Sequence, residues 1–184
     1  IEQFLYVNQT LRRINNQSLL ENGEVSDKKR YWQGAFGRLP NSARRANFAD
    51  HRVYQYNGET IDEAVHMGID LASIRHAEIP AANAGKVAFA GPIGIYGNTA
   101  LIDHGYGLFS VYAHLSRFSV NAGDMVEKGD IIGNTGTTGL AGGDHLHYGM
   151  FIGHVYVNPV EWWDAAWIEN NITSKLESIS SIIN

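Results

Sequence analysis

Apolar side chains recur every three or four positions near the amino end of the chain. The recurring positions are Phe4, Leu5, Leu11, Ile14, Leu19 and Leu20. This spacing places them on one face of an α-helix. Gly23 follows directly, and glycine is the residue that most often ends a helix. The pattern therefore predicts an N-terminal helix that runs to about Asn22.

Between Val53 and Val157 the apolar runs become short, and each is bounded by Gly, Asn or Asp. Examples are the runs 85–90, 99–103, 108–112 and 130–132. Short runs with such boundaries are typical of β-strands. A long helix would need sustained three-to-four periodicity, which this range lacks. We therefore expect a turn-rich β domain here.

A second helix is predicted after the β region. Asn158 is suited to be its N-cap, Pro159 its first residue, and Glu161 lies in its first turn. The tryptophans of this region are expected to pack it onto the sheet: Trp162, Trp163 and Trp167. The last stretch, 174–184, is weakly amphipathic and should continue the helix or fray.

The stretch from Asp27 to Asp50 is basic and irregular. Gly34, Gly37 and Pro40 interrupt it. Its basic side chains are Lys28, Lys29, Arg30, Arg38, Arg44 and Arg45. Two interpretations stay open: a solvated linker, or a segment that lies against the functional site. Because the β core begins later, a chain lacking residues 1–32 is expected to fold.

Composition narrows the class of protein. The chain has 184 residues, 44% apolar and 18% charged, which suits one globular domain with short appendages. Its formal net charge of −5 argues against a nucleic-acid partner, and no run approaches the roughly 20 apolar residues of a membrane span. The absence of cysteine excludes disulfides, thiol nucleophiles and Cys-based metal sites. Because the chain begins at Ile1, we expect a piece of a longer protein whose export signal cannot be judged.

The eight histidines carry the most informative chemistry. In the run Val-His-Met-Gly-Ile-Asp-Leu at 65–71, the period of two of an extended strand points His66, Gly68 and Asp70 to one face. Gly68 leaves room between the imidazole and the carboxylate. Both groups can therefore converge on one ion.

A second element has the same geometry. In Asp-His-Leu-His-Tyr-Gly at 144–149, both His145 and His147 point to one face while Leu146 turns into the core. Imidazole and carboxylate suit zinc, and three protein ligands leave a position open for water. His114 alone would be a histidine at the edge of the core, but in one cysteine-free β domain with these elements it becomes a third candidate. The other histidines are expected to be structural or exposed: His51, His76, His104 and His154.

Two other kinds of site find no support. The glycine-rich run 133–143 lacks the Lys and Ser/Thr pair of a P-loop, and no helix follows it. A loop that brings backbone close to an extended substrate fits it better. The Gly-x-Ser-x-Gly elbow of serine hydrolases is absent from the sequence.

These residues resemble a known family. The His-x-Gly-x-Asp element at 66–70, the Tyr-Ala-His-Leu element at 112–115 and the His-Leu-His element at 145–147 are similar to those of the lysostaphin-type zinc metallopeptidases, the LytM domain of peptidase family M23. The similarity covers roughly residues 60 to 160, in the right order.

The resemblance implies a mainly β fold, an antiparallel β-sheet groove of the LytM or duplicated-hybrid type with flanking N- and C-terminal helices. The expected division is an N-terminal helix and basic linker (1–50), the peptidase domain (51–160) and a C-terminal helix (161–184). The resemblance also implies zinc bound by His66, Asp70 and His147. His114 and His145 would flank the zinc-bound water, His145 taking its proton and His114 donating toward the oxyanion.

The function implied is a zinc-dependent endopeptidase that cleaves peptide cross-links or stem peptides of bacterial peptidoglycan, in the periplasm or outside the cell, with regulatory protein partners a further expectation. One alternative is a catalytically inactive LytM-type activator of another cell-wall hydrolase, although all five site residues are present. Another is a biotinyl or lipoyl carrier, suggested by 123–133, but Lys128 lacks the Met-Lys setting of such carriers and a carrier needs no His-x-His.

A regulatory hypothesis concerns the basic segment 27–50. The chain must pass near the metal before it reaches His66, and Asn41 or Asn47 could offer a carbonyl oxygen to the zinc in place of water, which would silence the enzyme. The competing interpretation is that the arginines solvate a linker or attract the anionic wall polymer.

Overall fold

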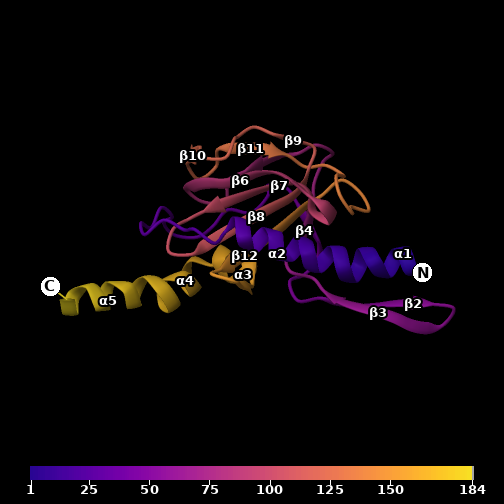
Figure 1. The fold of residues 1–184 in the computed structure, drawn as a ribbon. Helices are drawn as coiled ribbons and strands as arrows, with labels where there is room; N and C mark the ends of the chain where they lie inside the picture. Colours follow the sequence, from indigo (N-terminus) through magenta and orange to yellow (C-terminus); the bar gives the residue numbers. More distant parts are fainter. Residues whose placement is uncertain (184) are drawn as a thin grey trace.

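The computed structural model describes residues 1–183, and its centre is a large antiparallel β-sheet (Figure 1). The strand order is β1-β4-β12-β8-β7-β6-β10, with β13 paired to β12. The strands are β1 (Ala43–Ala46), β4 (Ile69–Ala72), β6 (Gly85–Ile93), β7 (Gly97–Asp103), β8 (Leu108–Leu115), β10 (Met125–Val126), β12 (Leu146–Ile152) and β13 (Val155–Val157). The mainly β fold with flanking helices that the sequence predicts is confirmed.

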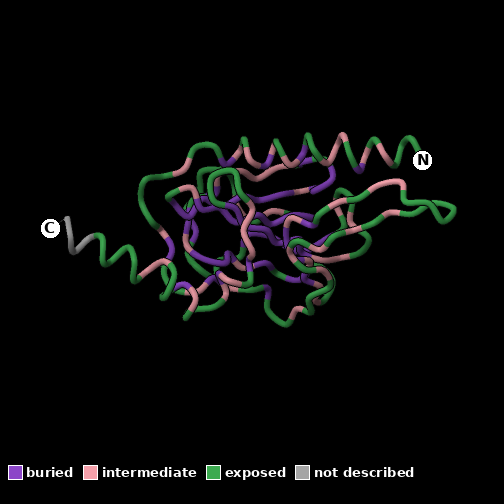
Figure 2. Tube along the Cα trace, turned by 90° about the horizontal axis from the view of Figure 1, so that it is seen from below, coloured by how far each residue is buried: buried purple, intermediate pink, exposed green. Residues whose placement is uncertain are grey.

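The two faces of this sheet pack into two separate cores, because its central strands are apolar on both sides. All of β8 is buried, and its side chains alternate between faces as a strand requires. Leu108 and Tyr112 lie in a first core, whereas Phe109 and Val111 lie in a second. Figure 2 shows this buried centre beneath a largely exposed N-terminal helix.

A small three-stranded sheet covers the face of the first core. It has the order β5-β11-β9, built from β5 (Glu78–Pro80), β11 (Ile131–Asn134) and β9 (Arg117–Phe118). Ile79 and Ile132 bring it into contact with the first core.

The N-terminal helix covers the face of the second core. It is one continuous helical stretch of α1 (Glu2–Leu5), the π-helical turn η1 (Tyr6–Leu11) and α2 (Arg12–Asn22), and it ends where the sequence predicts. Leu19 is fully buried in the second core. A Cβ at Gly23 would lie 2.6 Å from the Phe151 ring, so the residue after the helix must be small for the helix to reach the sheet.

The basic segment 27–50 is part of the fold, which corrects the interpretation of it as a solvated linker. Trp32, Phe36 and Leu39 are buried in the first core, and residues 43–46 form the edge strand β1, paired antiparallel with β4. The interpretation as a solvated linker is therefore wrong. The basic residues around them made the buried apolar side chains hard to recognise in the sequence. The division of the chain at residue 50 stays a prediction.

A β-hairpin lies beside the N-terminal helix (Figure 1). It consists of β2 (His51–Tyr56) and β3 (Glu59–Val65). Phe4 packs edge-on against Tyr54, with ring centroids 5.2 Å apart, and the Asn8 amide donates to Asp62 at 2.5 Å. The helix and hairpin thus form one wall beside the sheet.

The C-terminal helices begin as predicted. Asn158 accepts a hydrogen bond from the Val160 amide at the start of α3 (Pro159–Trp163), and Asp164 caps α4 (Ala165–Ile168). The π-helical turn η3 (Glu169–Thr173) and α5 (Ser174–Ile183) continue outward, away from the sheet (Figure 1). Trp162 is buried against Trp32, as expected for a helix packed onto the core. No helix in the described part of the chain has the length and apolarity to cross a membrane.

Candidate metal centre

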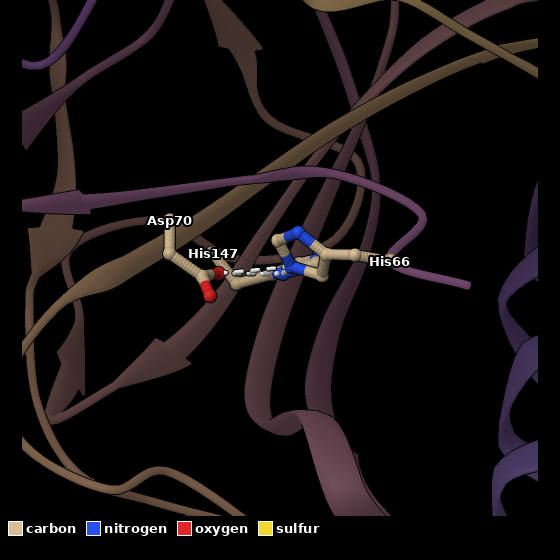
Figure 3. Close-up of side chains that lie close together, drawn as sticks. All are labelled: His66, Asp70 and His147. Carbon is tan, nitrogen blue, oxygen red and sulfur yellow. Dashed lines mark hydrogen bonds and ion pairs between the residues drawn. The ribbon is translucent and has the colours of Figure 1, made fainter. Parts of the chain in front are cut away.

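Three side chains from two distant stretches of the sequence meet on the sheet face that the N-terminal helix covers (Figure 3). His66 Nε2 lies 3.1 Å from Asp70 Oδ1, and His147 Nδ1 lies 3.1 Å from the same oxygen. The two imidazole nitrogens are 3.0 Å apart. Two imidazoles and one carboxylate suit zinc. The residues present therefore fit a divalent metal ion.

The pairing of β4 with β12 explains why Asp70 and His147 lie side by side. Asp70 is the direct partner of His147 in the antiparallel register, and both point away from the first core, in which Ile69, Leu71, Leu146 and Tyr148 lie.

His66 reaches the same point by a different path, which corrects the predicted strand over 66–70. The residues between Val65 and Ile69 form a bend rather than a strand. The space above Gly68 is filled by the His147 ring, since a Cβ at Gly68 would lie 2.7 Å from its Nε2. Position 68 must therefore be glycine, because any side chain there would collide with the His147 imidazole.

Asn47 holds His66 in one tautomer. The Asn47 carbonyl accepts a hydrogen bond from His66 Nδ1 at 2.8 Å, so in the neutral ring Nε2 carries the lone pair toward Asp70. A backbone acceptor of this kind orients metal-bound histidines in many proteins. The hypothesis that Asn47 offers a carbonyl oxygen to the metal in place of water stays a prediction; in this structure its backbone carbonyl contacts His66, and its side-chain amide donates to Asp50. Asn41 is outside the cleft, and its carbonyl lies beside the Ser73 hydroxyl.

His145 and His114 flank the three donors and share one hydrogen-bonding arrangement. His145 Nδ1 donates to the Gly143 carbonyl at 2.7 Å, and His114 Nδ1 donates to the Thr138 carbonyl at 2.9 Å. Each neutral ring therefore presents a bare Nε2. His145 Nε2 is 3.6 Å from Asp70 Oδ1, and the two rings are 4.8 Å apart. The structure brings all five predicted residues together.

His114 arrives there through an irregular backbone. By strand alternation it would share the face of Tyr112, in the first core. Its φ of +64° and the register shift between β7 and β8 opposite it turn the ring to the face of the other histidines instead. A β-bulge that redirects one side chain in this way is common beside active sites.

Burial and charge set the protonation of these groups. Burial raises the pKa of Asp70, but hydrogen bonds from His145, His147 and His66 outweigh it and hold that pKa well below its usual range. Burial lowers the pKa of His114 to about 4 and also lowers the pKa of His147. Burial lowers the pKa of His145 too, but the Asp70 carboxylate and the Gly143 carbonyl raise it further, for a net increase. The carboxylate is thus ionised, and His114 and His147 are neutral near pH 7.

Sequence reasoning missed two parts of the site. Asp144 anchors the loop before His145: it accepts from the Thr135 hydroxyl at 2.5 Å and from the His76 amide at 3.2 Å. The N-terminal helix forms a wall of the cleft, to which it contributes Asn8 and Arg12. The local sequence pattern does not reveal either part. The polar face of the helix has the same pattern whether it lines a cleft or faces solvent, and the partners of Asp144 are distant in the sequence.

Comparisons with known proteins agree with this geometry. The model of Peptidase family M23 matches residues 64–159. The DD-carboxypeptidase/endopeptidase Mpg of Neisseria meningitidis serogroup B is 43% identical over 96 residues, which cover 52% of this chain and 22% of Mpg. The peptidoglycan DD-endopeptidase ShyC of Vibrio cholerae is 33% identical over 127 residues, covering 68% of this chain and 29% of ShyC. The matches thus span less than a third of these relatives.

A solved structure has the same fold. The catalytic domain of the antimicrobial peptidase lysostaphin from Staphylococcus simulans superposes with a TM-score of 0.59 at 25% sequence identity, over 71% of this chain and 98% of that domain. The superposition covers most of the described chain, so the likeness extends beyond the candidate metal centre to the sheet that carries it.

Proposed function

Because this chain belongs to peptidase family M23 and is a metallopeptidase, we propose that it is a zinc-dependent endopeptidase that cleaves peptide cross-links or stem peptides of bacterial peptidoglycan. The observation that carries the proposal is the convergence of His66, Asp70 and His147 with two further imidazoles whose Nε2 atoms face the same cleft. The relatives named as peptidoglycan DD-endopeptidases support the substrate class. Such a substrate places the enzyme in the periplasm or outside the cell.

His66, Asp70 and His147 would hold the ion through His66 Nε2, a carboxylate oxygen and His147 Nδ1. Zinc bound there supplies a Lewis acid and brings the pKa of a bound water toward neutrality. His145 is the general base in this proposal, since its bare Nε2 lies beside the ligand oxygen of Asp70 and can accept the proton of the attacking water.

His114 faces the oxygen that becomes negative on the scissile carbonyl. Its resting ring is neutral, with the Nδ1 proton donated to the Thr138 carbonyl, so Nε2 can donate to the oxyanion only in the imidazolium form, whose second ring proton would have to come from solvent water. His145 then returns its own proton to the leaving amine. The buried position of His114 strengthens any hydrogen bond it makes to the oxyanion.

Metal analysis combined with digestion of purified cell walls tests the proposal. We expect about one zinc per chain in the wild type, and loss of both zinc and muropeptide release in His66→Ala, Asp70→Ala and His147→Ala. His145→Ala and His114→Ala should keep zinc, while turnover falls by about 100-fold or more. The exposed His154→Ala serves as the matched control and should change neither quantity.

The outcomes separate the proposal from its rivals. Full zinc content in the three ligand variants would overturn the metal assignment. A zinc-loaded wild type that releases no fragment from chemically distinct walls would favour the inactive activator. Mass spectrometry of the released muropeptides identifies the bond that is cut.

A further inference from the structure

Two arginines line the cleft above the metal centre. The cavity holds about 220 Å³ and is bounded on one side by the predicted metal ligands. The N-terminal helix contributes Arg12, and β2 contributes Arg52. Asp70 is the one acidic side chain among the residues that line this cavity. The chain as a whole carries a net negative charge, whereas the charged side chains that line this cavity are two arginines and one aspartate.

The Arg12 guanidinium is held in place without a carboxylate partner. Its Nε donates to the Asn8 carbonyl at 3.2 Å, and its Nη2 donates to the Asn8 side-chain oxygen at 2.8 Å. Asn8 is itself buried and donates to Asp62 of the hairpin. Among the described residues, Arg12 forms no ion pair. A half-buried, oriented cation is thus left with free N–H donors.

Arg52 brings the positive charge next to the reacting centre. Its Nη2 lies 3.4 Å from Asp70 Oδ2, the oxygen that the histidines do not contact. A guanidinium has five N–H donors in a fixed fork, and this single contact leaves most of them unused. Both arginines line the same cavity as the candidate metal ligands, and Arg52 contacts one of them directly.

We propose that Arg12, assisted by Arg52, binds a free carboxylate on the substrate residue that supplies the nitrogen of the scissile bond. This inference rests on the proposed function and narrows its substrate. A cross-link through a diamino diacid such as meso-diaminopimelate carries a carboxylate on the carbon bonded to that nitrogen. A cross-link through lysine has only hydrogen there, and an internal glycine bridge has an amide. The cleft thus selects the diacid cross-link.

The same carboxylate has a second chemical source. In an uncross-linked pentapeptide the last residue also supplies the scissile nitrogen, and its terminal carboxylate occupies the same position. The shared chemistry is therefore an α-carboxylate next to the leaving nitrogen, and the substrates used in the test separate the two sources.

Binding to metal-free protein tests the site without relying on catalysis. The probes are the tripeptides L-Ala–γ-D-Glu–meso-diaminopimelate and L-Ala–γ-D-Glu–L-Lys, which differ by one carboxylate, measured by calorimetry in the presence of a chelator. We expect the wild type to bind the first about tenfold more tightly, as a charge-assisted hydrogen bond to a carboxylate implies. Arg12→Gln should reduce this preference to about one. Arg13→Gln, on the exposed side of the same helix, should keep it.

Equal binding of the two tripeptides by the wild type would overturn the inference whether or not any variant folds. A preference that survives in Arg12→Gln, with an unchanged melting temperature, would also overturn it, and Arg12 would then only tie the helix to the hairpin through Asn8.

Activity of the zinc-loaded protein provides the second readout. The ratio of kcat/KM between diaminopimelate- and lysine-linked dimers should fall about tenfold in Arg12→Gln and stay unchanged in Arg13→Gln. A loss confined to the pentapeptide would support the carboxylate site with the chain terminus as its source. Equal cleavage of both dimers by the wild type would overturn the inference while the peptidase assignment stands. A binding preference in a protein that cleaves nothing would support the carboxylate site and refute the proposed function.

Discussion

His114 has an unfavourable backbone conformation, and that conformation is what places its imidazole in the candidate site. A histidine in the left-handed region is uncommon, because its Cβ crowds the following carbonyl. The surrounding strands nonetheless hold it at a φ of +64°, and only this conformation turns the imidazole away from the first core. The strain is therefore the structural cost of placing His114 beside the candidate metal ligands.

Two substitutions at this residue separate strain from chemistry. His114→Ala and His114→Gly both remove the imidazole, so both should lose activity to the same degree. Glycine adopts a positive φ without strain, and His114→Gly should be more stable than His114→Ala by about 1 kcal/mol. Urea denaturation at pH 7 measures the difference. An alanine variant that is equally stable or more stable would show that the bulge stores no strain.

The N-terminal helix is the element whose role changes most between sequence and structure. It covers the second core through Leu19, and the Asn15 side chain accepts a hydrogen bond from the Ile95 amide at 2.8 Å. It also supplies a wall of the cleft. The expectation that a chain lacking residues 1–32 still folds is therefore not supported, since Leu19 and Trp32 would both be lost from buried positions.

The contribution of this helix can be measured with one matched pair. Leu19 is 0% exposed and Ile14 is 45% exposed, and both lie on α2. Leu19→Ala should lower the free energy of unfolding by about 3 kcal/mol, since it leaves a cavity in the second core. Ile14→Ala should change it by less than about 0.5 kcal/mol. Similar losses in the two variants, measured by chemical denaturation, would contradict the packing of the helix onto the sheet.

At the scale of the whole molecule, a buried histidine links the first core to the chain segments around it. His104 is completely buried. Its Nδ1 donates to the Ala84 carbonyl at 2.7 Å, and its Nε2 accepts from the Ser110 hydroxyl at 2.7 Å. Ser110 bonds the Tyr112 hydroxyl, which accepts from the Ala82 amide. The imidazole in this chain of hydrogen bonds is neutral at pH 7, because its complete burial disfavours the charge that a second ring proton would bring.

The stability of the fold should therefore fall in mild acid. Burial lowers the pKa of His104 to about 4, from 6.5 in an unfolded chain. The unfolded state takes up the proton first, so stability is intact above pH 6.5 and is lost as the pH falls from 6.5 toward 4, by about 3 kcal/mol from this group.

Denaturation at several pH values between 7 and 4 checks this prediction. His104→Gln keeps a donor and an acceptor but does not titrate, so its stability should depend less steeply on pH than that of the wild type. The exposed His154→Gln is the control and should follow the wild type. Parallel curves for the wild type and His104→Gln would refute the role of His104.

The sequence by itself predicted the elements and the identity of the candidate metal ligands. Periodicity placed the N-terminal helix, the main strands and the start of the C-terminal helix, because each depends on contacts between near neighbours in the chain. The His-x-His spacing predicted that His145 and His147 share a face, because side chains alternate along a strand. The same rule named His66 and Asp70 as candidates, although residues 66–68 are not in a strand.

Tertiary structure alone decided which groups surround the candidate metal centre. The bulge that redirects His114, the carbonyl of Asn47 behind His66, and the burial of Trp32 and Phe36 in an apparently basic linker all depend on partners far away in the sequence. Arg12 lies in the cleft only because Leu19 docks its helix on the sheet. A local pattern records whether a residue is polar and on which face it lies. It does not record what packs against that face, because the packing is settled by long-range contacts among whole elements.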